Sequence, residues 1–274
     1  MRVLVQCRDR PGRHELLREA STSLEKYGLE ISDNPEIIIS LGGDGTTLYS
    51  CLKFRKPILP VRAFTSQGYI TDFGMDRIDE ACEKLSKDLF YIDRRMMLDY
   101  YKNDAKMGSV ANEVTIFQAP RRWKAERDFK TYEAMRYSVH ADGKPLFGYD
   151  KLIGDGVTVS TPTGSTAYNR SALGYVINPN SHMIVVTLRY PICLELKNQR
   201  SRILDGNSVI EFGFYKPTEA FLVADVECRE ITNSDVIKVK KSDNTFDLVK
   251  VNGMRENRSS KERRRKEWFT RQEF

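Results

Sequence analysis

Residues 37–47 read IIISLGGDGTT, an isoleucine-rich run followed directly by glycines and a carboxylate. A short, continuously apolar run of this kind is typical of a strand that is buried on both faces of a parallel sheet. The glycines allow a sharp turn and a close approach of backbone N–H groups to a ligand, and residues 46–54 are then expected to form a helix. Ligands of open α/β sheets bind at the carboxyl ends of the strands, so this turn is a candidate binding site.

The sequence around this turn alternates between strand-like and helix-like segments. Strands are expected at 2–8, 37–41 and 57–61, and helices at 14–27, 46–54 and 78–85. Such alternation predicts a parallel sheet covered by helices over about the first 90 residues.

Beyond about residue 91 the sequence changes to short extended segments. Strands are expected at 110–118, 135–140, 157–161, 183–188, 209–215, 221–226, 236–239 and 248–251. Asp142-Gly143 is a plausible tight hairpin turn, and one helix is expected after Ser165. A succession of short strands predicts a sandwich-like β domain.

These patterns predict an α/β fold class, with an N-terminal Rossmann-like α/β domain and a C-terminal β-sandwich-like domain. The first domain is expected to span residues 1–95 and to carry the glycine turn, and the β-rich domain to span 96–255. Residues 256–274 are strongly basic. We interpret them as a tail that is either a solvated charged segment or one that returns to the first domain.

Composition narrows the class of protein. Of the 274 residues, 40% are apolar and 30% charged, and no apolar run approaches the ~20 residues that span a bilayer. There is also no secretory signal, so we expect a soluble, cytoplasmic protein without membrane partners. The net charge of +6 suits an anionic small molecule as well as nucleic acid. Five scattered cysteines and three separated histidines give no support for a disulfide framework or a metal site.

Asp44 is the chemically unusual member of the glycine turn. A carboxylate beside bound phosphates costs electrostatic energy, but it could accept a proton from an attacking hydroxyl or hold that hydroxyl in line. The alternative is that Asp44 only caps the following helix. No GK[ST] follows the glycines, so the turn is not a Walker A loop.

A second informative segment, residues 154–168, reads GDGVTVSTPTGSTAY. Pro162 and Gly164 favour an irregular loop, and Ser165 and Thr166 offer hydroxyls that could cap a helix. Tyr168 provides an aromatic face and a hydroxyl for a base or a ribose. The alternative is a Ser/Thr-rich turn that merely opens a helix.

These segments resemble known motifs. GGDGT resembles the motif shared by NAD kinases, by diacylglycerol and sphingosine kinases and, in a related form, by phosphofructokinases. It indicates phosphoryl transfer to a hydroxyl. Residues 154–168 are similar to the GDG…STPTGSTAY motif of the NAD kinase family, and Asn112-Glu113 resembles its NE motif. The resemblance implies phosphoryl transfer from ATP, or another donor, to the 2′-hydroxyl of the adenosine ribose of NAD, which gives NADP.

The resemblance also implies residue roles. Asp44 would be the catalytic base that activates the hydroxyl. Asn112 and Glu113 would meet the adenosine and ribose portions, and Asp155 the nicotinamide end, often from a neighbouring subunit. The implied phosphate loop consists of Gly42, Gly43, Gly45 and Thr46. The implied NAD-binding residues are Gly45, Tyr69, Asn112, Glu113, Asp155, Thr166, Ala167, Tyr168 and Ser171.

The resemblance further implies Mg²⁺, or another divalent cation, brought with the nucleotide donor and held largely by phosphates and water. It also implies a homodimer or a homotetramer. Three segments depart from the family pattern, and for one of them, the S-x-R-P stretch, Arg189-Tyr190-Pro191 is the nearest counterpart. Thr65 stands where the family has a glycine, before Gly68-Tyr69, and Val226-Glu227 replace Gly-Gln after Asp225. The choice of donor and the preference for NAD or NADH stay open.

Three other functions are compatible with parts of the sequence. A lipid kinase of the same superfamily predicts lipid acceptors and attraction to membranes, but it does not predict TPTGSTAY. A non-catalytic dinucleotide sensor predicts NAD binding without turnover and gives Asp44 no role. Nucleic-acid binding by the tail lacks interleaved aromatic residues beyond Trp268 and Phe269.

Overall fold

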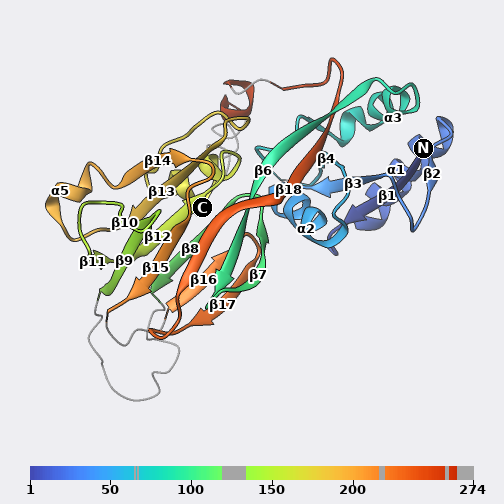
Figure 1. The fold of residues 1–274 in the computed structure, drawn as a ribbon. Helices are drawn as coiled ribbons and strands as arrows, with labels where there is room; N and C mark the ends of the chain where they lie inside the picture. Colours follow the sequence, from blue (N-terminus) through green and yellow to red (C-terminus); the bar gives the residue numbers. More distant parts are fainter. Residues whose placement is uncertain (65, 67, 119–133, 216–219, 257–258, 264–274) are drawn as a thin grey trace. The chain divides into compact units, whose positions relative to one another are not determined.

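The computed structural model describes residues 1–64, 66, 68–118, 134–215, 220–256 and 259–263. The chain forms two compact units (Figure 1). Unit 1 comprises Met1–Arg94 and Phe246–Phe274, and unit 2 comprises Arg95–Thr245. Residues 264–274 of the predicted tail lie outside the described residues.

Unit 1 is built on a parallel sheet. Its strands are β1 (Arg2–Cys7), β2 (Glu30–Ile31), β3 (Ile37–Gly42), β4 (Ile58–Arg62) and β5 (Phe73–Gly74). The pairs β2–β1, β1–β3, β3–β4 and β4–β5 are all parallel. Every residue of β3 is buried, as the isoleucine run at 37–41 predicts for a central strand.

Helices follow the strands of unit 1 and cover its sheet (Figure 1). They are α1 (Arg13–Lys26), α2 (Asp44–Phe54), the short 3₁₀ helix η1 (Met75–Arg77) and α3 (Ile78–Ser86). Helix α1 buries Ala20 and Leu24, and α3 buries Ala81 and Leu85, which are the apolar positions at helical spacing. Helix α2 begins at Asp44, two residues earlier than the sequence pattern indicates.

Unit 2 is a two-layer β structure. One layer is a six-stranded antiparallel sheet in the order β14 (Ser201–Asp205), β13 (Met183–Arg189), β12 (Gly156–Ser160), β8 (Glu113–Gln118), β16 (Ala220–Ala224) and β17 (Glu227–Ile231). The strands of the other layer are β6 (Phe90–Lys102), β7 (Ala105–Val110), β9 (Met135–Ala141), β10 (Lys144–Pro145), β11 (Leu152–Gly154), β15 (Ile210–Phe214) and β18 (Ile237–Val251). Strands β6 and β18 each begin in one unit and end in the other.

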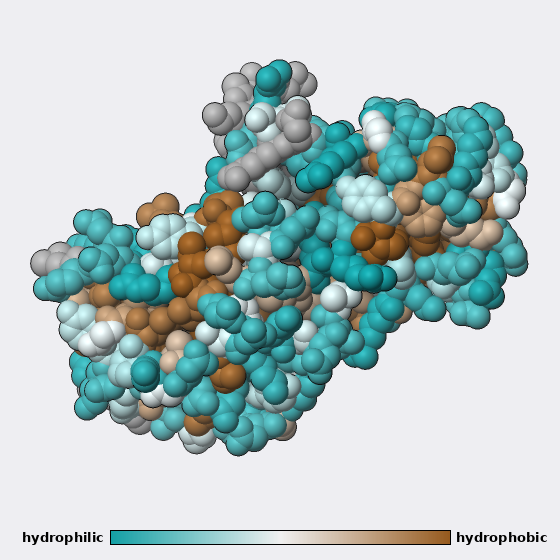
Figure 2. All heavy atoms as spheres, turned by 45° about the horizontal axis from the view of Figure 1, so that its top comes forward, coloured by the Kyte–Doolittle hydropathy of each residue, from teal (hydrophilic) through white to brown (hydrophobic). Residues whose placement is uncertain are grey.

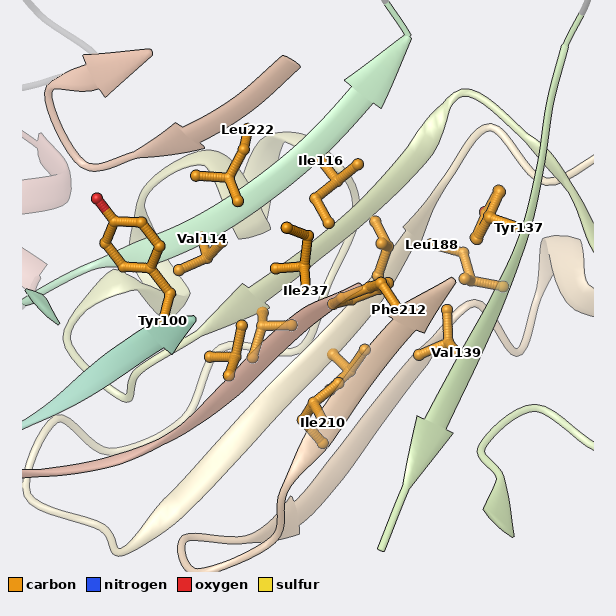
Figure 3. Close-up of a cluster of buried hydrophobic side chains, with 14 of the residues drawn as sticks. Tyr100, Val114, Ile116, Tyr137, Val139, Leu188, Ile210, Phe212, Leu222 and Ile237 are labelled. Carbon is orange, nitrogen blue, oxygen red and sulfur yellow. The ribbon is translucent and has the colours of Figure 1, made fainter. Parts of the chain in front are cut away.

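The core of unit 2 lies between these layers (Figure 3). Val114 and Ile116 of β8 point toward Phe212 of β15 and Ile237 of β18. Met135, Tyr137 and Val139 of β9 all belong to this core, because every second side chain of a strand points to the same face. The structure therefore has the predicted α/β fold, with a Rossmann-like first unit and a β-sandwich-like second unit.

Strand β18 corrects two expectations from the sequence. The segments expected at 236–239 and 248–251 are one continuous strand, Ile237–Val251. The polar stretch KKSDNT at 240–245 resembles a loop, but its side chains are mostly exposed along the middle of this strand. The end of β18 pairs in parallel with β4, Leu248 opposite Ile58, so residues 246–255 belong to unit 1 rather than to the β domain.

Smaller elements were predicted with mixed success. The Asp142-Gly143 hairpin is confirmed: it joins β9 to β10, and both residues have the positive φ that such a tight turn requires. The helix after Ser165 is reduced to η3 (Gly164–Thr166) and the four-residue α4 (Tyr168–Ser171). A further short helix, α5 (Leu194–Lys197), was not expected. None of the described helices is long and apolar enough to cross a membrane.

Candidate functional site

The glycine turn lies at the carboxyl end of β3. Gly42 is the last residue of the strand, Gly43 precedes the helix, and Asp44 is the first residue of α2. A Cβ atom on Gly42 would lie 2.4 Å from Thr46 Oγ1, so no larger residue fits there without movement of the helix. The Thr47 hydroxyl donates to the Gly43 carbonyl at 3.2 Å. The turn is therefore packed tightly against the first turn of α2.

The Asp44 carboxylate is held by the loop at residues 68–72. The Tyr69 backbone N–H donates to Oδ2 at 2.7 Å, and the Ile70 N–H donates to Oδ1 at 2.9 Å. A Cβ atom on Gly68 would lie 2.5 Å from Oδ1, which explains the glycine there. Gly43 occupies the cap position of α2, and no side chain caps this helix. Asp44 therefore binds the 68–72 loop and does not cap its own helix, and each oxygen keeps a further acceptor site.

Arg8 is a site residue that sequence reasoning did not single out. It follows β1, and its guanidinium donates to the Gly45 carbonyl at 3.1 Å. The sequence holds several arginines in this region, and nothing in their spacing separates Arg8 from Arg10 or Arg13. The structure places a positive charge beside the glycine turn, where an anionic ligand would be stabilised.

Tyr69 lies close to the glycine turn, as its predicted role requires, but its hydroxyl faces the C-terminal segment. That hydroxyl donates to Glu262 Oε1 at 3.1 Å. The ring is half-buried. Stacking of Tyr69 on a base stays a prediction.

In unit 2, the segment Ala111–Glu113 is held by Asp225. The carboxylate accepts hydrogen bonds from three successive backbone N–H groups, those of Ala111 (2.7 Å), Asn112 (2.9 Å) and Glu113 (3.1 Å). The residue is partly exposed, whereas the three amides enclose its carboxylate. Within residues 224–227, which read ADVE, Asp225 therefore fixes the backbone of the Ala111–Glu113 segment, a role that the sequence alone does not indicate.

The 161–168 loop packs directly on Asn112. The Thr161 N–H donates to the Asn112 carbonyl at 2.8 Å, and the Thr161 hydroxyl donates to the Ala111 carbonyl at 2.6 Å. A Cβ atom on Gly164 would lie 2.2 Å from the Asn112 carbonyl oxygen. The glycine of this loop is therefore required by its contact with Asn112, the residue before β8.

Asn169 anchors the other end of this loop, and sequence reasoning missed it. The buried side-chain amide donates to the Ser165 carbonyl at 3.3 Å and to the Tyr175 carbonyl at 2.8 Å. Its oxygen accepts a hydrogen bond from the Thr187 hydroxyl at 2.6 Å. A single asparagine in a short polar segment forms no sequence pattern from which these hydrogen-bond partners can be predicted.

Glu113 is buried beside the 161–168 loop and has an unsatisfied oxygen. Its carboxylate accepts a hydrogen bond from the Tyr168 backbone N–H. Its Oε2 atom has no hydrogen-bond partner among the described residues, and neither do the buried Thr163 Oγ1 and Arg189 Nε atoms. Buried polar atoms are rarely left unpaired, so these atoms are candidate partners for ordered water or for a polar ligand.

The electrostatic environment of Glu113 is unusual. Burial, with the negative charge of Asp225 nearby, raises the pKa of Glu113 to about 8. The Tyr168 N–H and the charge of Arg189 oppose this rise. In the free protein near neutral pH, the carboxyl group therefore carries a proton for much of the time. A ligand that donates hydrogen bonds to the ionised form would release that proton.

Glu113→Gln is expected to make thermal stability less dependent on pH. The folded-state pKa of Glu113 is raised above its unfolded value of 4.5, so its stabilising contribution is complete below 4.5 and is lost as the pH rises through about 8. The Tm of the variant minus the Tm of the wild type should therefore increase from pH 5 to pH 8.5 in ligand-free protein. A constant difference across this range would contradict the raised pKa.

The remaining predicted residues lie around this loop. Thr166 ends η3, Ala167 links η3 to α4, and Ser171 ends α4. Tyr168 is 60% exposed, so its ring is accessible to a ligand. Asp155 lies between β11 and β12, where its N–H donates to the Arg189 carbonyl at 3.0 Å.

The predicted residues therefore form two groups, one in each unit. Unit 1 gathers the glycine turn, Asp44 and Tyr69, while unit 2 gathers Asn112, Glu113 and the 161–168 loop. Among the residues that the structure describes, no group of three histidine, cysteine or acidic side chains is arranged to hold a metal ion.

Comparisons with known proteins point to one family. The family model for the ATP-NAD kinase C-terminal domain matches residues 111–251. The chain is 31% identical over 244 residues to an NAD kinase of Caldanaerobacter subterraneus, an alignment that covers 85% of this chain and 80% of the relative. It is 36% identical over 186 residues to an NAD kinase of Lachnospira eligens, covering 66% of this chain and 58% of the relative.

Two solved structures share the fold. Yeast NADH kinase complexed with NADH superposes with a TM-score of 0.78 at 19% identity, covering 100% of this chain and 89% of the yeast chain. An NAD kinase from Archaeoglobus fulgidus in complex with ATP gives a TM-score of 0.76 at 20% identity, covering 96% of this chain and 99% of that chain. At this identity the two structures establish the fold alone.

Proposed function

The chain belongs to the NAD kinase family, and from this we propose that it transfers a phosphoryl group from ATP to the 2′-hydroxyl of the adenosine ribose of NAD. The observation that carries the catalytic part of this proposal is the Asp44 carboxylate, which two backbone amides hold at the end of the glycine turn. The products are NADP and ADP. The comparisons favour neither the lipid kinase nor the dinucleotide sensor.

Asp44 acts as the general base. Its oxygens each accept one amide hydrogen bond and keep a free acceptor site for the 2′-hydroxyl. As the ribose oxygen forms its bond to the γ-phosphorus, the proton of the hydroxyl passes to Asp44 and the bond from phosphorus to the β-phosphate oxygen breaks. Phosphoryl transfer depends mainly on such alignment, and the two amides supply it for the base.

The residues of unit 2 bind NAD. The unpaired Glu113 Oε2 accepts a ribose hydroxyl, and Asn112 meets the adenosine portion. Tyr168, whose ring is exposed, offers a face to the base. Thr166, Ala167 and Ser171 line the same loop, and Asp155 contacts the nicotinamide end.

The donor phosphates bind at the glycine turn. The first amides of α2 offer N–H donors for phosphate oxygens, as at other helix N-termini. Arg8, beside Gly45, adds a positive charge. Mg²⁺ or a similar cation, brought by the nucleotide, neutralises charge on the phosphates.

The proposed activity is tested directly with purified protein. NAD or NADH and Mg²⁺ are mixed with ATP, another nucleoside triphosphate or polyphosphate in turn, and the product is detected with an NADP-specific dehydrogenase. NADP formation with ATP is the expected result. Binding of NAD without turnover would favour the sensor instead, and phosphorylation of diacylglycerol or sphingosine in vesicles without action on NAD would favour the lipid kinase.

We further propose that the protein is a cytoplasmic homodimer or homotetramer. All five cysteines are free, which suits a reducing compartment. Figure 2 shows apolar residues gathered on the surface of unit 2. The exposed apolar side chains of unit 2 include Ile153, Tyr190 and Ile192. The Ile192 N–H donates to the Ile153 carbonyl, and the Asp155 N–H donates to the carbonyl of Arg189, so these residues lie close to Asp155. An exposed apolar group of this kind suits a subunit contact.

Ile192→Glu is expected to dissociate the assembly. A charge placed in an apolar contact must be desolvated, so the subunits should separate. Light scattering coupled to size exclusion should give the wild type a multiple of 31.6 kDa and the variant the monomer mass. Val236→Glu, at a similarly exposed apolar residue of unit 2, is the control and should leave the mass unchanged. An unchanged mass for Ile192→Glu would remove this surface from the interface.

A further inference from the structure

Three charged side chains are buried together in unit 1, outside the residues to which the function assigns a role. Lys250 Nζ lies 2.5 Å from Asp72 Oδ2, and Lys261 Nζ lies 2.6 Å from Asp72 Oδ1. The three side chains are only 5%, 10% and 8% exposed, for Lys250, Lys261 and Asp72 respectively. Lys250 comes from β18, whereas Lys261 comes from the basic C-terminal segment.

The cluster is ionised despite its burial. Burial alone would raise the pKa of Asp72, but the charges and hydrogen bonds of Lys250 and Lys261 hold this pKa below its usual value. A buried ion cluster contributes little net stability, so the effect of this cluster lies in the positions in which it holds the neighbouring backbone.

The two lysines also bind the backbone of the 68–72 loop. Lys261 Nζ donates to the Tyr69 carbonyl at 2.9 Å, and Lys250 Nζ donates to the Ile70 carbonyl at 3.3 Å. The backbone N–H groups of the same two loop residues are the donors to Asp44. The loop is therefore held by lysines through its carbonyls, while it holds the catalytic carboxylate through its amides.

One peptide group joins Lys261 to Asp44 directly. The Tyr69 carbonyl and the Ile70 N–H belong to the same peptide, which is planar. Its oxygen accepts from Lys261 at 2.9 Å and its N–H donates to Asp44 Oδ1 at 2.9 Å. Fixing the direction of the carbonyl therefore fixes the direction of the N–H. A positive charge at the oxygen also polarises the peptide and strengthens its N–H as a donor.

We propose that Lys261 is a positioning residue for phosphoryl transfer, which orients Asp44 through the Tyr69–Ile70 peptide, with Lys250 and Asp72 completing the anchor. The inference rests on the proposed function of Asp44. It assigns a role to the beginning of the basic C-terminal segment, whose first residues bind the 68–72 loop.

Lys261→Met tests the proposal because methionine keeps most of the apolar stem and removes the charge. The turnover number for NADP formation should fall about 10- to 100-fold, as expected for a misplaced catalytic group. The KM for NAD should change by less than about threefold, since most residues proposed to bind NAD belong to unit 2.

Lys84→Met is the matched control. Lys84 Nζ likewise donates to a carboxylate oxygen, Glu80 Oε1 at 2.8 Å, and to a backbone carbonyl, Asn252 at 2.8 Å. It lies in the same unit but forms no hydrogen bond or ion pair with Asp44 or with any described residue of the 68–72 loop. Its turnover should equal that of the wild type. An equal loss in both variants would mean that Lys261 is merely structural.

A double variant separates positioning from an independent contribution. If Lys261 acts only through the Asp44 carboxylate, then Lys261→Met should cause no further loss of turnover in the Asp44→Asn background. Losses that multiply would overturn the proposal, because Lys261 would then act elsewhere. Should Lys261→Met fail to fold, Lys261→Gln, which is also neutral, takes its place with the same expectations.

Hydrogen exchange provides a readout that does not need activity. The Tyr69 and Ile70 amides should exchange faster in Lys261→Met than in the wild type, whereas Lys84→Met should leave them unchanged. If the two amides exchange faster in Lys261→Met but the wild type makes no NADP, the proposed function is refuted while the contact between Lys261 and the loop is supported. Unchanged exchange together with unchanged turnover, in a wild type that makes NADP, would refute the positioning role alone.

Discussion

Asp44→Asn is expected to lower the turnover number for NADP formation by about two orders of magnitude or more. The amide has nearly the shape of the carboxylate, but it cannot accept the proton of the 2′-hydroxyl. Its NH₂ group would also face one of the two backbone N–H groups that the carboxylate now binds. The variant therefore loses both the base and part of its alignment.

The measurement is steady-state kinetics with NAD and ATP, with NADP detected by a coupled dehydrogenase. Affinity for NAD should be retained, because Asn112, Glu113 and the 161–168 loop are untouched. Asp33→Asn, at an exposed aspartate of the same unit, should behave as the wild type. A normal turnover number for Asp44→Asn would refute the role of Asp44 as the base.

Asp225→Asn is expected to weaken NAD binding and to destabilise the fold. The carboxylate now accepts three backbone N–H groups, from Ala111, Asn112 and Glu113. An asparagine oxygen cannot accept all three, and its NH₂ group would face a donor. Leaving a buried amide without an acceptor costs about 1–3 kcal/mol, so a loss on the order of 3 kcal/mol in the free energy of unfolding is expected.

The KM for NAD should rise about tenfold or more, because Asn112 and Glu113 lose the group that holds their backbone. Asp235→Asn is the control for stability alone. Asp235 Oδ2 also accepts a backbone N–H, that of Thr232 at 2.8 Å, and it binds Lys102 at 3.0 Å, but it has no contact with Asn112 or Glu113. If both variants are destabilised but the KM for NAD rises in Asp225→Asn alone, Asp225 supports the NAD-binding segment. An unchanged KM in both variants would contradict this role.

Much of the fold follows from local patterns in the sequence. The isoleucine run before Gly42 predicts a buried strand, and β3 is buried throughout. Asp142-Gly143 predicts a hairpin and forms one. These predictions succeed because burial on two faces and positive φ angles restrict the residue types that fit. Strand β18 was split in two because its polar middle is exposed, and an exposed strand carries no apolar signal.

The site was predicted to a similar extent. The GGDGT and TPTGSTAY motifs identify Asp44 and the loop at 161–168. Gly42 of the first motif is needed at a close contact with Thr46, and Gly164 of the second at a close contact with the Asn112 carbonyl. The partners of these residues could not be identified in this way. Asp225 binds an amide 113 residues away, and Lys261 binds a carbonyl 192 residues away. A carboxylate or a lysine has the same appearance in a sequence whether it is solvated or anchors a distant backbone.

The amino-acid pattern is enough to predict the two-part α/β and β architecture, the family resemblance and the residues of the two motifs. Each of these depends on neighbouring residues and on the backbone conformations that they permit. The folded chain is needed to see how Asp44 is held, which acid supports the Asn112-Glu113 segment and where Lys261 lies. These features are hydrogen bonds between segments far apart in the chain, and the backbone groups that they join are chemically identical at almost every residue.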